Sequence, residues 1–296
     1  MGLLSTLRDW ADFVKISHTI FAMPFALAAM AIAARENRGW PGWRLFLLII
    51  AAMVCARTCA MAFNRIVDRR FDALNPRTAG RHLPAGRIRV ASAWTLWALS
   101  AAGLVGVAWC INPLCFQLSP VALGVVCFYS LTKRFTDYTH LFLGIALGLA
   151  PVGAWLAVRG SLSWQPVFLG VAVVFWLIGF DIIYALQDYE FDRTHGLRSL
   201  VVAWGPKNAL MAAFLAHMVM WCLLAAFGLL AKFRHAYFIG MAMILVCLLL
   251  EHIIARRRSL HWINTAFFKL NAVISAVFLV VTLAEVVFPD FFRLRR

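Results

Sequence analysis

The chain has 296 residues, of which 63% are hydrophobic and 14% are charged, and its formal net charge at pH 7 is +15. A composition this apolar excludes an ordinary soluble globular domain and is typical of a protein with many membrane-spanning helices. The positive charge does not indicate a nucleic-acid partner, because membrane proteins keep an excess of lysine and arginine on their cytoplasmic side. We therefore expect an integral membrane protein in contact with lipid.

The N-terminal segment up to Lys15 interleaves apolar and charged residues, which predicts an amphipathic helix on the membrane surface. Nine apolar stretches follow, and we expect each to cross the membrane as a helix. They lie at about 18–34, 45–63, 90–110, 119–131, 141–157, 166–186, 208–231, 236–254 and 266–288.

The distribution of lysine and arginine predicts how the chain is oriented. With nine spans, the side of the membrane that carries the N-terminus also carries the larger share of these residues, which indicates a cytoplasmic N-terminus and an outer C-terminus. The tail residues Arg293, Arg295 and Arg296 then fall on the outer side, which weighs against an odd number of spans. The expected location is the cytoplasmic (inner) membrane of a bacterium.

Two long polar connections, about 64–89 and 187–207, follow the second and the sixth span on the same membrane side. This repeat predicts two similar four-helix halves around a central cavity. The fold class is therefore all-α and polytopic, with one domain over 1–296. Its parts are a first half at about 18–134, a second half at about 140–258 and a ninth helix at about 266–288.

The end of the second span carries a polar stripe. Asn64, Asp68 and Asp72 recur every four residues, so on a helix they share one face. Arg57 falls on nearly the same face, one to two turns deeper in the membrane. An arginine inside a membrane helix is unfavourable without a partner, so this residue needs an explanation.

The end of the sixth span repeats the pattern with Asp181, Tyr184, Asp188 and Asp192. Carboxylates near a bilayer are unfavourable unless they meet water, a partner or a metal. Their oxygens suit Mg²⁺, which typically binds through one or two carboxylates and substrate phosphates. The alternative is that they pair with neighbouring arginines, but two equivalent copies on one membrane side favour the metal site.

Basic residues accompany both stripes. The loop from residue 75 to 89 separates Arg77, Arg81 and Arg87 by proline and glycine, which predicts a mobile cover that brings cations to phosphate groups. Lys133 and Arg134 end the fourth span. They either hold a departing diphosphate or anchor the helix at the lipid headgroups.

Together, NRIVDRRFDALNPRT, YSLTKRFT and DIIYALQDYEFDRTHGLRS resemble the UbiA family of intramembrane aromatic prenyltransferases over essentially the whole chain. The branch that prenylates 4-hydroxybenzoate is the most similar. The resemblance implies nine helices and a cavity open laterally to lipid for the isoprenoid tail. It also implies two Mg²⁺ ions that hold a polyprenyl diphosphate, and transfer of its polyprenyl group to a ring carbon of the aromatic acid in ubiquinone or menaquinone biosynthesis. The active site would face the cytoplasm.

The resemblance also implies a role for each polar residue. The metal and diphosphate ligands would be Asn64, Asp68, Asp72, Asp188 and Asp192. The residues that neutralise diphosphate oxygens would be Arg65, Arg77, Lys133 and Arg134. Arg57 would receive the carboxylate of the aromatic acid, and Arg198 stands where relatives often have lysine at the substrate site. Asp181 and Tyr184 would face the reacting groups, with Asp181 orienting the phenol, accepting a proton or stabilising the allylic cation.

Alternatives remain at this stage. The acceptor could be a dihydroxynaphthoate of a menaquinone route instead of 4-hydroxybenzoate. A CDP-alcohol phosphotransferase would need a DGxxAR run, which the sequence lacks. A transporter with an acidic ion path would need polar residues through the depth of the bilayer, whereas here they gather at one face. The sequence indicates neither the oligomeric state nor the length of the prenyl chain.

Overall fold

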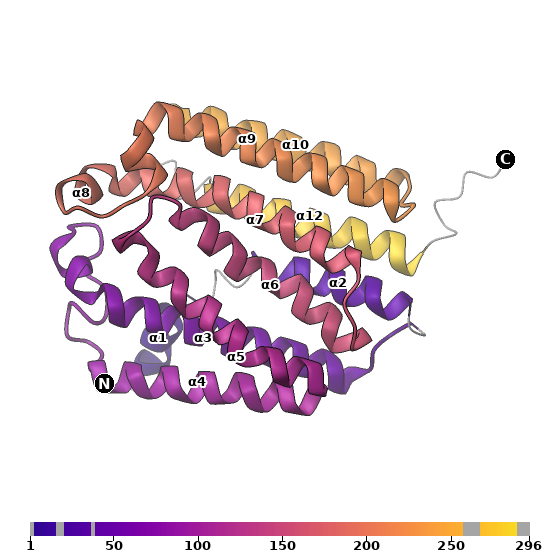
Figure 1. Cartoon of the computed structure of the whole chain (residues 1–296), viewed down its shortest axis with the longest axis horizontal. Helices are drawn as coiled ribbons and strands as arrows, with labels where there is room; N and C mark the ends of the chain where they lie inside the picture. The colour runs from indigo at the N-terminus through magenta and orange to yellow at the C-terminus, as the bar shows by residue number, and fades with distance from the viewer. Residues whose placement is uncertain (1–2, 16–20, 37–38, 257–266, 289–296) are drawn as a thin grey trace.

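The computed structural model describes residues 3–15, 21–36, 39–256 and 267–288 (Figure 1). Within these ranges the regular secondary structure is entirely helical. The α-helices are α1 (Leu3–Phe13), α2 (Met23–Arg35), α3 (Trp43–Leu74), α4 (Val90–Ile111), α5 (Pro113–Phe128), α6 (Thr139–Arg159), α7 (Trp164–Ala185), α8 (Tyr189–Thr194), α9 (Leu200–Leu230), α10 (His235–Arg256) and α12 (Phe268–Val287). Two short 3₁₀ helices, η2 (Tyr129–Arg134) and η3 (Leu186–Asp188), continue α5 and α7.

Eight segments in the described part of the chain are long and apolar enough to cross a membrane. The helix α2, with 13 residues, takes the place of the first predicted span. The beginning of that predicted span, residues 18–20, lies outside the described residues. The all-α membrane fold is therefore confirmed.

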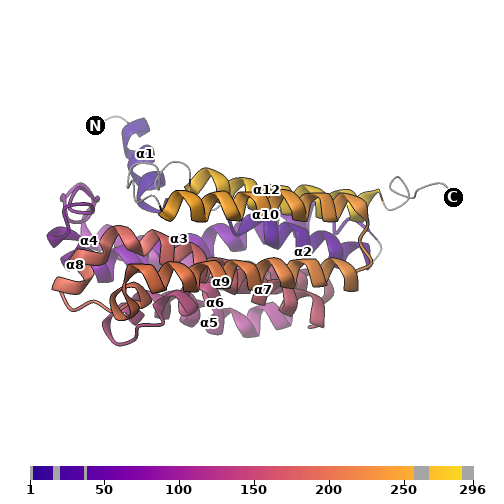
Figure 2. The same ribbon diagram turned by 90° about the horizontal axis from the view of Figure 1, so that it is seen from above.

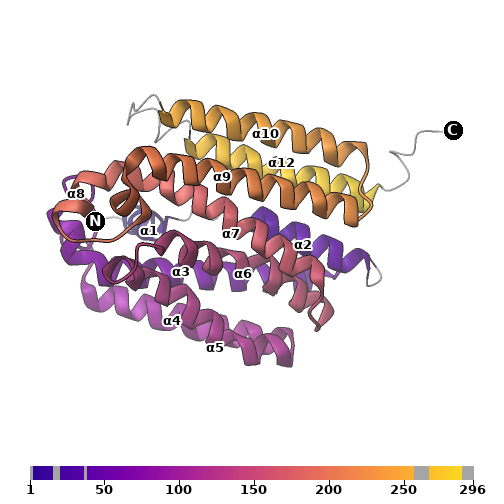
Figure 3. The same cartoon turned by 45° about the horizontal axis from the view of Figure 1, so that its top comes forward.

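The long helices run along a common direction (Figures 1 and 3). The pair α6 and α7 lies between α3, α4 and α5 on one side and α9, α10 and α12 on the other (Figure 3). A core of large apolar side chains, including Trp155, Trp176, Phe227 and Phe278, joins α6 and α7 to the second group. The loop after α3 and the helix α8 lie at one end of the bundle (Figure 1).

Several helix ends differ from their prediction. The helix α3 continues to Leu74 instead of ending near residue 63, so the first polar stripe lies within a helix. The helix α5 begins at Pro113, not near residue 119, because Asn112 caps it by accepting a hydrogen bond from the Cys115 N–H at 2.8 Å. The helix α9 begins at Leu200 and contains a kink at Gly205, whose φ is 76°.

Glycines let the backbones of α6 and α7 approach closely. A Cβ atom on Gly148 would lie 2.8 Å from the carbonyl oxygen of Gly170, and one on Gly144 would lie 2.8 Å from that of Val174. Small residues at such contacts allow membrane helices to pack backbone to backbone. The two antiparallel helices are therefore held in a fixed register, with the start of α6 beside the end of α7.

The helix α1 is set across the direction of the long helices (Figure 2). We expected its apolar face to lie on the membrane surface. In the structure Phe13 is 1% exposed and packs in one cluster with Ile66 of α3 and Ile88 of the loop that follows α3. This part of the predicted surface face is therefore covered by protein instead of lipid.

Candidate active site

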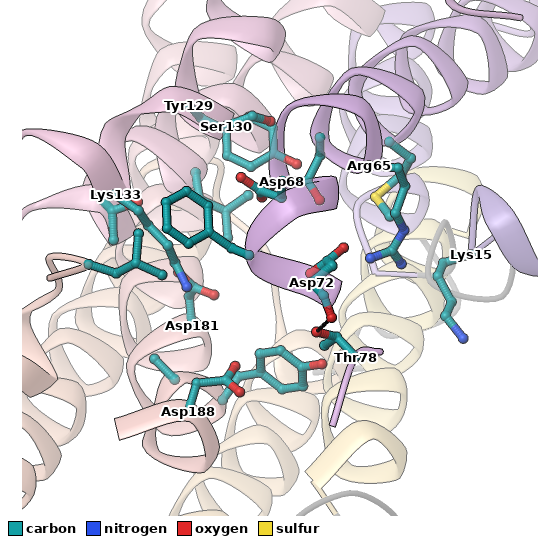
Figure 4. Close-up of a pocket in the computed structure, with 18 of the residues that line it drawn as sticks. Lys15, Arg65, Asp68, Asp72, Thr78, Tyr129, Ser130, Lys133, Asp181 and Asp188 are labelled. Atoms are coloured by element: carbon teal, nitrogen blue, oxygen red, sulfur yellow. Dashed lines mark hydrogen bonds between the residues drawn. The ribbon is translucent and has the colours of Figure 1, made fainter. Parts of the chain in front are cut away.

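A cavity of about 280 Å³ lies at the end of the bundle that carries the loop after α3. Figure 4 shows Asp68 and Asp72 on one wall and Asp181 and Asp188 on another. The predicted site residues that line the cavity are Arg57, Asn64, Arg65, Asp68, Asp72, Arg77, Lys133, Arg134, Asp181, Tyr184, Asp188 and Asp192. The two stripes, far apart in sequence, thus meet in one cavity.

The wall formed by α3 presents its stripe as predicted. The Asn64 amide donates a hydrogen bond to Asp68 Oδ2 at 2.9 Å. Asp72 Oδ1 accepts one from Arg81 Nη1 at 2.6 Å, and the hydroxyl of Thr78 donates to the backbone carbonyl of Asp72 at 3.0 Å. The loop that carries Thr78 and Arg81 therefore folds back onto the end of α3.

The opposite wall is closed by the same loop. The Nε of Arg77 donates to Asp188 Oδ1 at 2.8 Å, while its Nη2 binds Asp188 Oδ2. The amide of Asn75 donates to the same Asp188 Oδ1 at 2.9 Å, and Arg77 Nη1 donates to the Tyr184 hydroxyl at 2.9 Å. Burial acts to lower the pKa of Arg77, but the bonds to Asp188 and Tyr184 outweigh it and raise that pKa above its usual range.

The 3₁₀ helix η2 places one cation toward each wall. Lys133 Nζ lies 3.7 Å from Asp192 Oδ2, and Arg134 Nη2 donates to Asp68 Oδ1 at 2.9 Å. Arg198 does not line the cavity. Its guanidinium instead donates to the carbonyl of Phe135 at 3.0 Å and its side chain is exposed, so it binds the chain just after η2.

The four carboxylates expected to hold metal each face one cation. Pairing with a neighbouring arginine accounts for Asp188 and its partner Arg77, whereas the cations that face Asp68 and Asp192 come from η2. In the part of the chain that the structure describes, no three His, Cys, Asp or Glu side chains are grouped to hold a metal by themselves. However, Asp72 Oδ2 and Asp192 Oδ2 are buried and accept no hydrogen bond among the described residues. Buried oxygens of this kind are exceptional, and they fit a cation that arrives with a phosphate ligand.

Arg57 lies at the deep end of the cavity. Its Nε atom is buried and lacks a hydrogen-bond partner among the described residues. Arg57, Tyr129 and Leu147 also line a second cavity of about 230 Å³, whose other lining residues are apolar except Ser119. This second cavity lies among α3, α4, α5 and α6, so Arg57 stands where a polar and an apolar compartment meet.

Two further residues at the site were not singled out from the sequence. Lys15 lines the cavity and has a φ of 51°, in the left-handed region that side chains other than glycine rarely adopt. His140, at the start of α6, lies 2.7 Å from Asp181 Oδ2 through its Nδ1. A single lysine or histidine beside an apolar stretch gives no distinctive sequence signal. Their place at the site depends on how the helices pack, which the sequence alone does not show.

The fold and this cavity define a polytopic membrane protein with acidic and basic side chains gathered at one end of its bundle. The model of the UbiA prenyltransferase family matches residues 22–273. The chain is 32% identical over 258 residues to a 4-hydroxybenzoate octaprenyltransferase from Methylobacillus flagellatus, covering 86% of this chain and 84% of that relative. The protein belongs to the UbiA prenyltransferase family.

Solved structures share the fold. The apo structure of a UbiA homologue from Aeropyrum pernix K1 superposes with a TM-score of 0.81 at 30% identity, covering 91% of this chain and 98% of that one. A UbiA homologue from Archaeoglobus fulgidus bound to GPP and Mg²⁺ superposes with a TM-score of 0.70 at 22% identity, covering 93% of this chain and 99% of that one. At 22% identity the likeness concerns the fold.

Proposed function

We propose that the protein transfers a polyprenyl group from a polyprenyl diphosphate to a ring carbon of 4-hydroxybenzoate or a related hydroxy-aromatic acid, with Mg²⁺, in quinone biosynthesis. The main observation in support is that the two polar stripes, one on α3 and one running from α7 to α8, line the same cavity. That cavity is also lined by Arg77, Lys133 and Arg134. The relative from M. flagellatus, named for 4-hydroxybenzoate, supports this choice of acceptor.

The diphosphate binds between the two stripes. The guanidinium groups of Arg77 and Arg134 and the ammonium of Lys133 pair with its oxygens, while Arg65 lies beside the α3 stripe. The residues that would hold the metal ions are Asn64, Asp68, Asp72, Asp188 and Asp192. When bound, Mg²⁺ supplies positive charge that stabilises the departing diphosphate.

The apolar cavity among α3, α4, α5 and α6 receives the isoprenoid tail. Its walls carry many alanines, among them Ala52, Ala56, Ala150 and Ala154, so there is room for a branched hydrocarbon chain. Because lipid tails are as apolar as this lining, a tail dissolved in the bilayer can enter the cavity without contact with water. Its junction with the polar cavity, at Arg57 and Tyr129, is where the first isoprene unit lies.

Arg57 binds the carboxylate of the aromatic acid. A buried guanidinium nitrogen without a partner is unfavourable in a membrane, and a bidentate carboxylate satisfies it. This arrangement places the acceptor at the deep end of the polar cavity, with its phenol toward the remaining polar wall. A hydroxy-aromatic acid meets both requirements, whereas an acceptor without a carboxylate leaves Arg57 unpaired.

In the reaction the allylic C–O bond breaks and its electron pair leaves with the diphosphate. The ring carbon ortho to the phenol oxygen then forms a bond to the allylic cation, and loss of the ring proton restores aromaticity. Aromatic side chains at the cavity, including Trp176, Phe180 and Phe268, keep water from trapping the cation. The site faces the cytoplasm of the inner membrane, as the lysine and arginine distribution indicates.

The test is to incubate the purified protein with Mg²⁺, geranyl diphosphate and either 4-hydroxybenzoate or a dihydroxynaphthoate, and to detect prenylated product by mass. We expect product with 4-hydroxybenzoate and none after chelation of the metal. Asp68→Ala and Asp188→Ala should each abolish it. Glu190→Gln, at an exposed carboxylate paired with Arg193, is the matched control. Absence of product with every acceptor, or activity that survives both aspartate substitutions, contradicts the proposal.

A further inference from the structure

Asp181 on α7 has a buried partner that the reaction scheme above does not use. His140 Nδ1 lies 2.7 Å from Asp181 Oδ2, and the His140 side chain is 0% exposed. The Asp181 side chain is 18% exposed and lines the polar cavity. One oxygen of Asp181 is therefore bound to the histidine, while the carboxylate as a whole remains open to a bound molecule.

The packing of α6 against α7 fixes this pair. His140, Gly144 and Gly148 recur every four residues on one face of α6, and the two glycines touch the α7 backbone at Val174 and Gly170. Continuing the same antiparallel register by one turn brings His140 beside the end of α7, where Asp181 lies. The pair thus stands at the end of a rigid backbone contact, which holds the carboxylate in one orientation.

The surroundings of the histidine decide its hydrogen-bonding role. His140 Nε2 is buried and has no hydrogen-bond partner among the described residues. An unpaired, charged N–H would be far more unfavourable there than the unpaired lone pair of a neutral ring. The neutral tautomer that fits carries its proton on Nδ1 and donates it to Asp181.

We propose that Asp181 is the proton acceptor of the prenyl transfer and that His140 is its positioning residue. This inference rests on the proposed function. The neutral imidazole donates one hydrogen bond to Asp181 Oδ2, which keeps the carboxylate ionised and aims its other oxygen at the acceptor ring. A general base is more effective when a second side chain holds it in the orientation that the proton transfer requires.

The proton balance is simple. After the new C–C bond has formed, the ring C–H bond breaks and its electron pair returns to the ring. The proton passes to the free oxygen of Asp181, and the carboxylic acid then releases it to water at the mouth of the cavity. His140 neither gains nor loses a proton, so its role is separate from that of the residues that bind the diphosphate.

The experiment compares His140→Leu with His140→Asn in the prenyl-transfer assay, using 4-hydroxybenzoate with hydrogen or deuterium at the reacting ring positions. His140→Leu removes the donor, so kcat should fall roughly tenfold to a hundredfold with the KM for geranyl diphosphate unchanged. A primary deuterium isotope effect, absent in the wild type, should appear because proton removal becomes rate-limiting. His140→Asn keeps an N–H donor near the Nδ1 position and should restore kcat and remove the isotope effect.

His252→Asn is the matched control. His252 is also buried and bonded to a side chain, with its Nε2 2.9 Å from His217 Nδ1, but it does not line the cavity. The His252→Asn variant should show no isotope effect, even if the substitution makes the protein less stable. Unchanged kcat in His140→Leu, or a decrease without an isotope effect, overturns the inference while the proposed function stands. A wild-type protein that forms no prenylated product overturns both.

Discussion

Arg77 and Asp188 are 111 residues apart in the chain, and the guanidinium of Arg77 binds both carboxylate oxygens of Asp188. This contact joins the loop after α3 to the end of α7 and closes the polar cavity on that side. The Arg77 guanidinium also lies over the Tyr184 ring, with Cζ 5.2 Å from the ring centroid. The loop that the sequence predicted as a mobile cover is therefore seated on the second acidic stripe.

Arg77→Ala should weaken diphosphate binding, because it removes a cation from the cavity and leaves Asp188 without its main partner. We expect the KM for geranyl diphosphate to rise roughly tenfold to a hundredfold, as for the loss of a charged hydrogen bond. Arg77→Lys should recover only part of this, since an ammonium cannot bind both oxygens as a guanidinium does. Arg193→Ala, which removes an exposed arginine paired with Glu190, should leave this KM unchanged and serves as the control.

Arg57→Ala should act on the other substrate. Because Arg57 is proposed to bind the acceptor carboxylate, its loss should raise the KM for the aromatic acid roughly tenfold to a hundredfold. The KM for geranyl diphosphate should change much less. Steady-state kinetics with each substrate varied in turn will measure both values. Equal increases for the two substrates would refute the assignment of Arg57 to the acceptor.

The sequence was informative wherever the relevant spacing is local. Asn64, Asp68 and Asp72 share a helix face because they recur every four residues, and the structure confirms that face. The partner of each carboxylate was not predictable, because Arg134 reaches Asp68 across 66 residues of sequence and no local rule selects it. Arg198 illustrates the same limit, since its neighbours in sequence do not show that it turns toward Phe135.

His140 was missed for a related reason. Its sequence neighbours at the start of an apolar helix suggest only a packed histidine, and its contact with Asp181 depends on the register of α6 against α7. That register is set by Gly144 and Gly148, whose role emerges only when the opposing backbone is known. Positions that depend on helix-to-helix register are therefore the least accessible to sequence reasoning in this fold.

The contact between α1 and the loop after α3 should depend on pH. His82 Nε2 lies 3.4 Å from Asp9 Oδ1, yet burial and then Arg87 lower the pKa of His82, outweighing the opposite effect of Asp9. The unfolded protein therefore binds a proton more readily than the folded protein does. As a result, the free energy of unfolding should decrease as the pH falls below the ordinary histidine pKa of 6.5.

The measurement is the thermal midpoint in detergent from about pH 7 to about pH 5.5, across the ordinary histidine range. The wild type should lose stability over this interval, and His82→Asn should lose less. His195→Asn, at an exposed histidine that follows α8, should behave like the wild type. If the thermal midpoint depends on pH in the same way in the wild type and in His82→Asn, protonation of His82 does not destabilise the folded protein.

The apolar cavity should set which prenyl chains are accepted, and Gly153 offers a way to fill it. Gly153 lies on α6 and lines this cavity, and an added Cβ atom there would meet nothing within 4 Å, so a side chain can begin at this position without a clash and extend into the cavity. Gly153→Phe should therefore retain transfer from geranyl diphosphate and lose transfer from longer polyprenyl diphosphates. Gly106→Phe, on α4, is the matched control, because Gly106 is exposed, equally unobstructed and outside the cavity lining. The measurement is the amount of prenylated product, determined by mass, for polyprenyl diphosphates of increasing length. If Gly153→Phe reduces product formation equally at every length, the prenyl tail does not bind in this cavity.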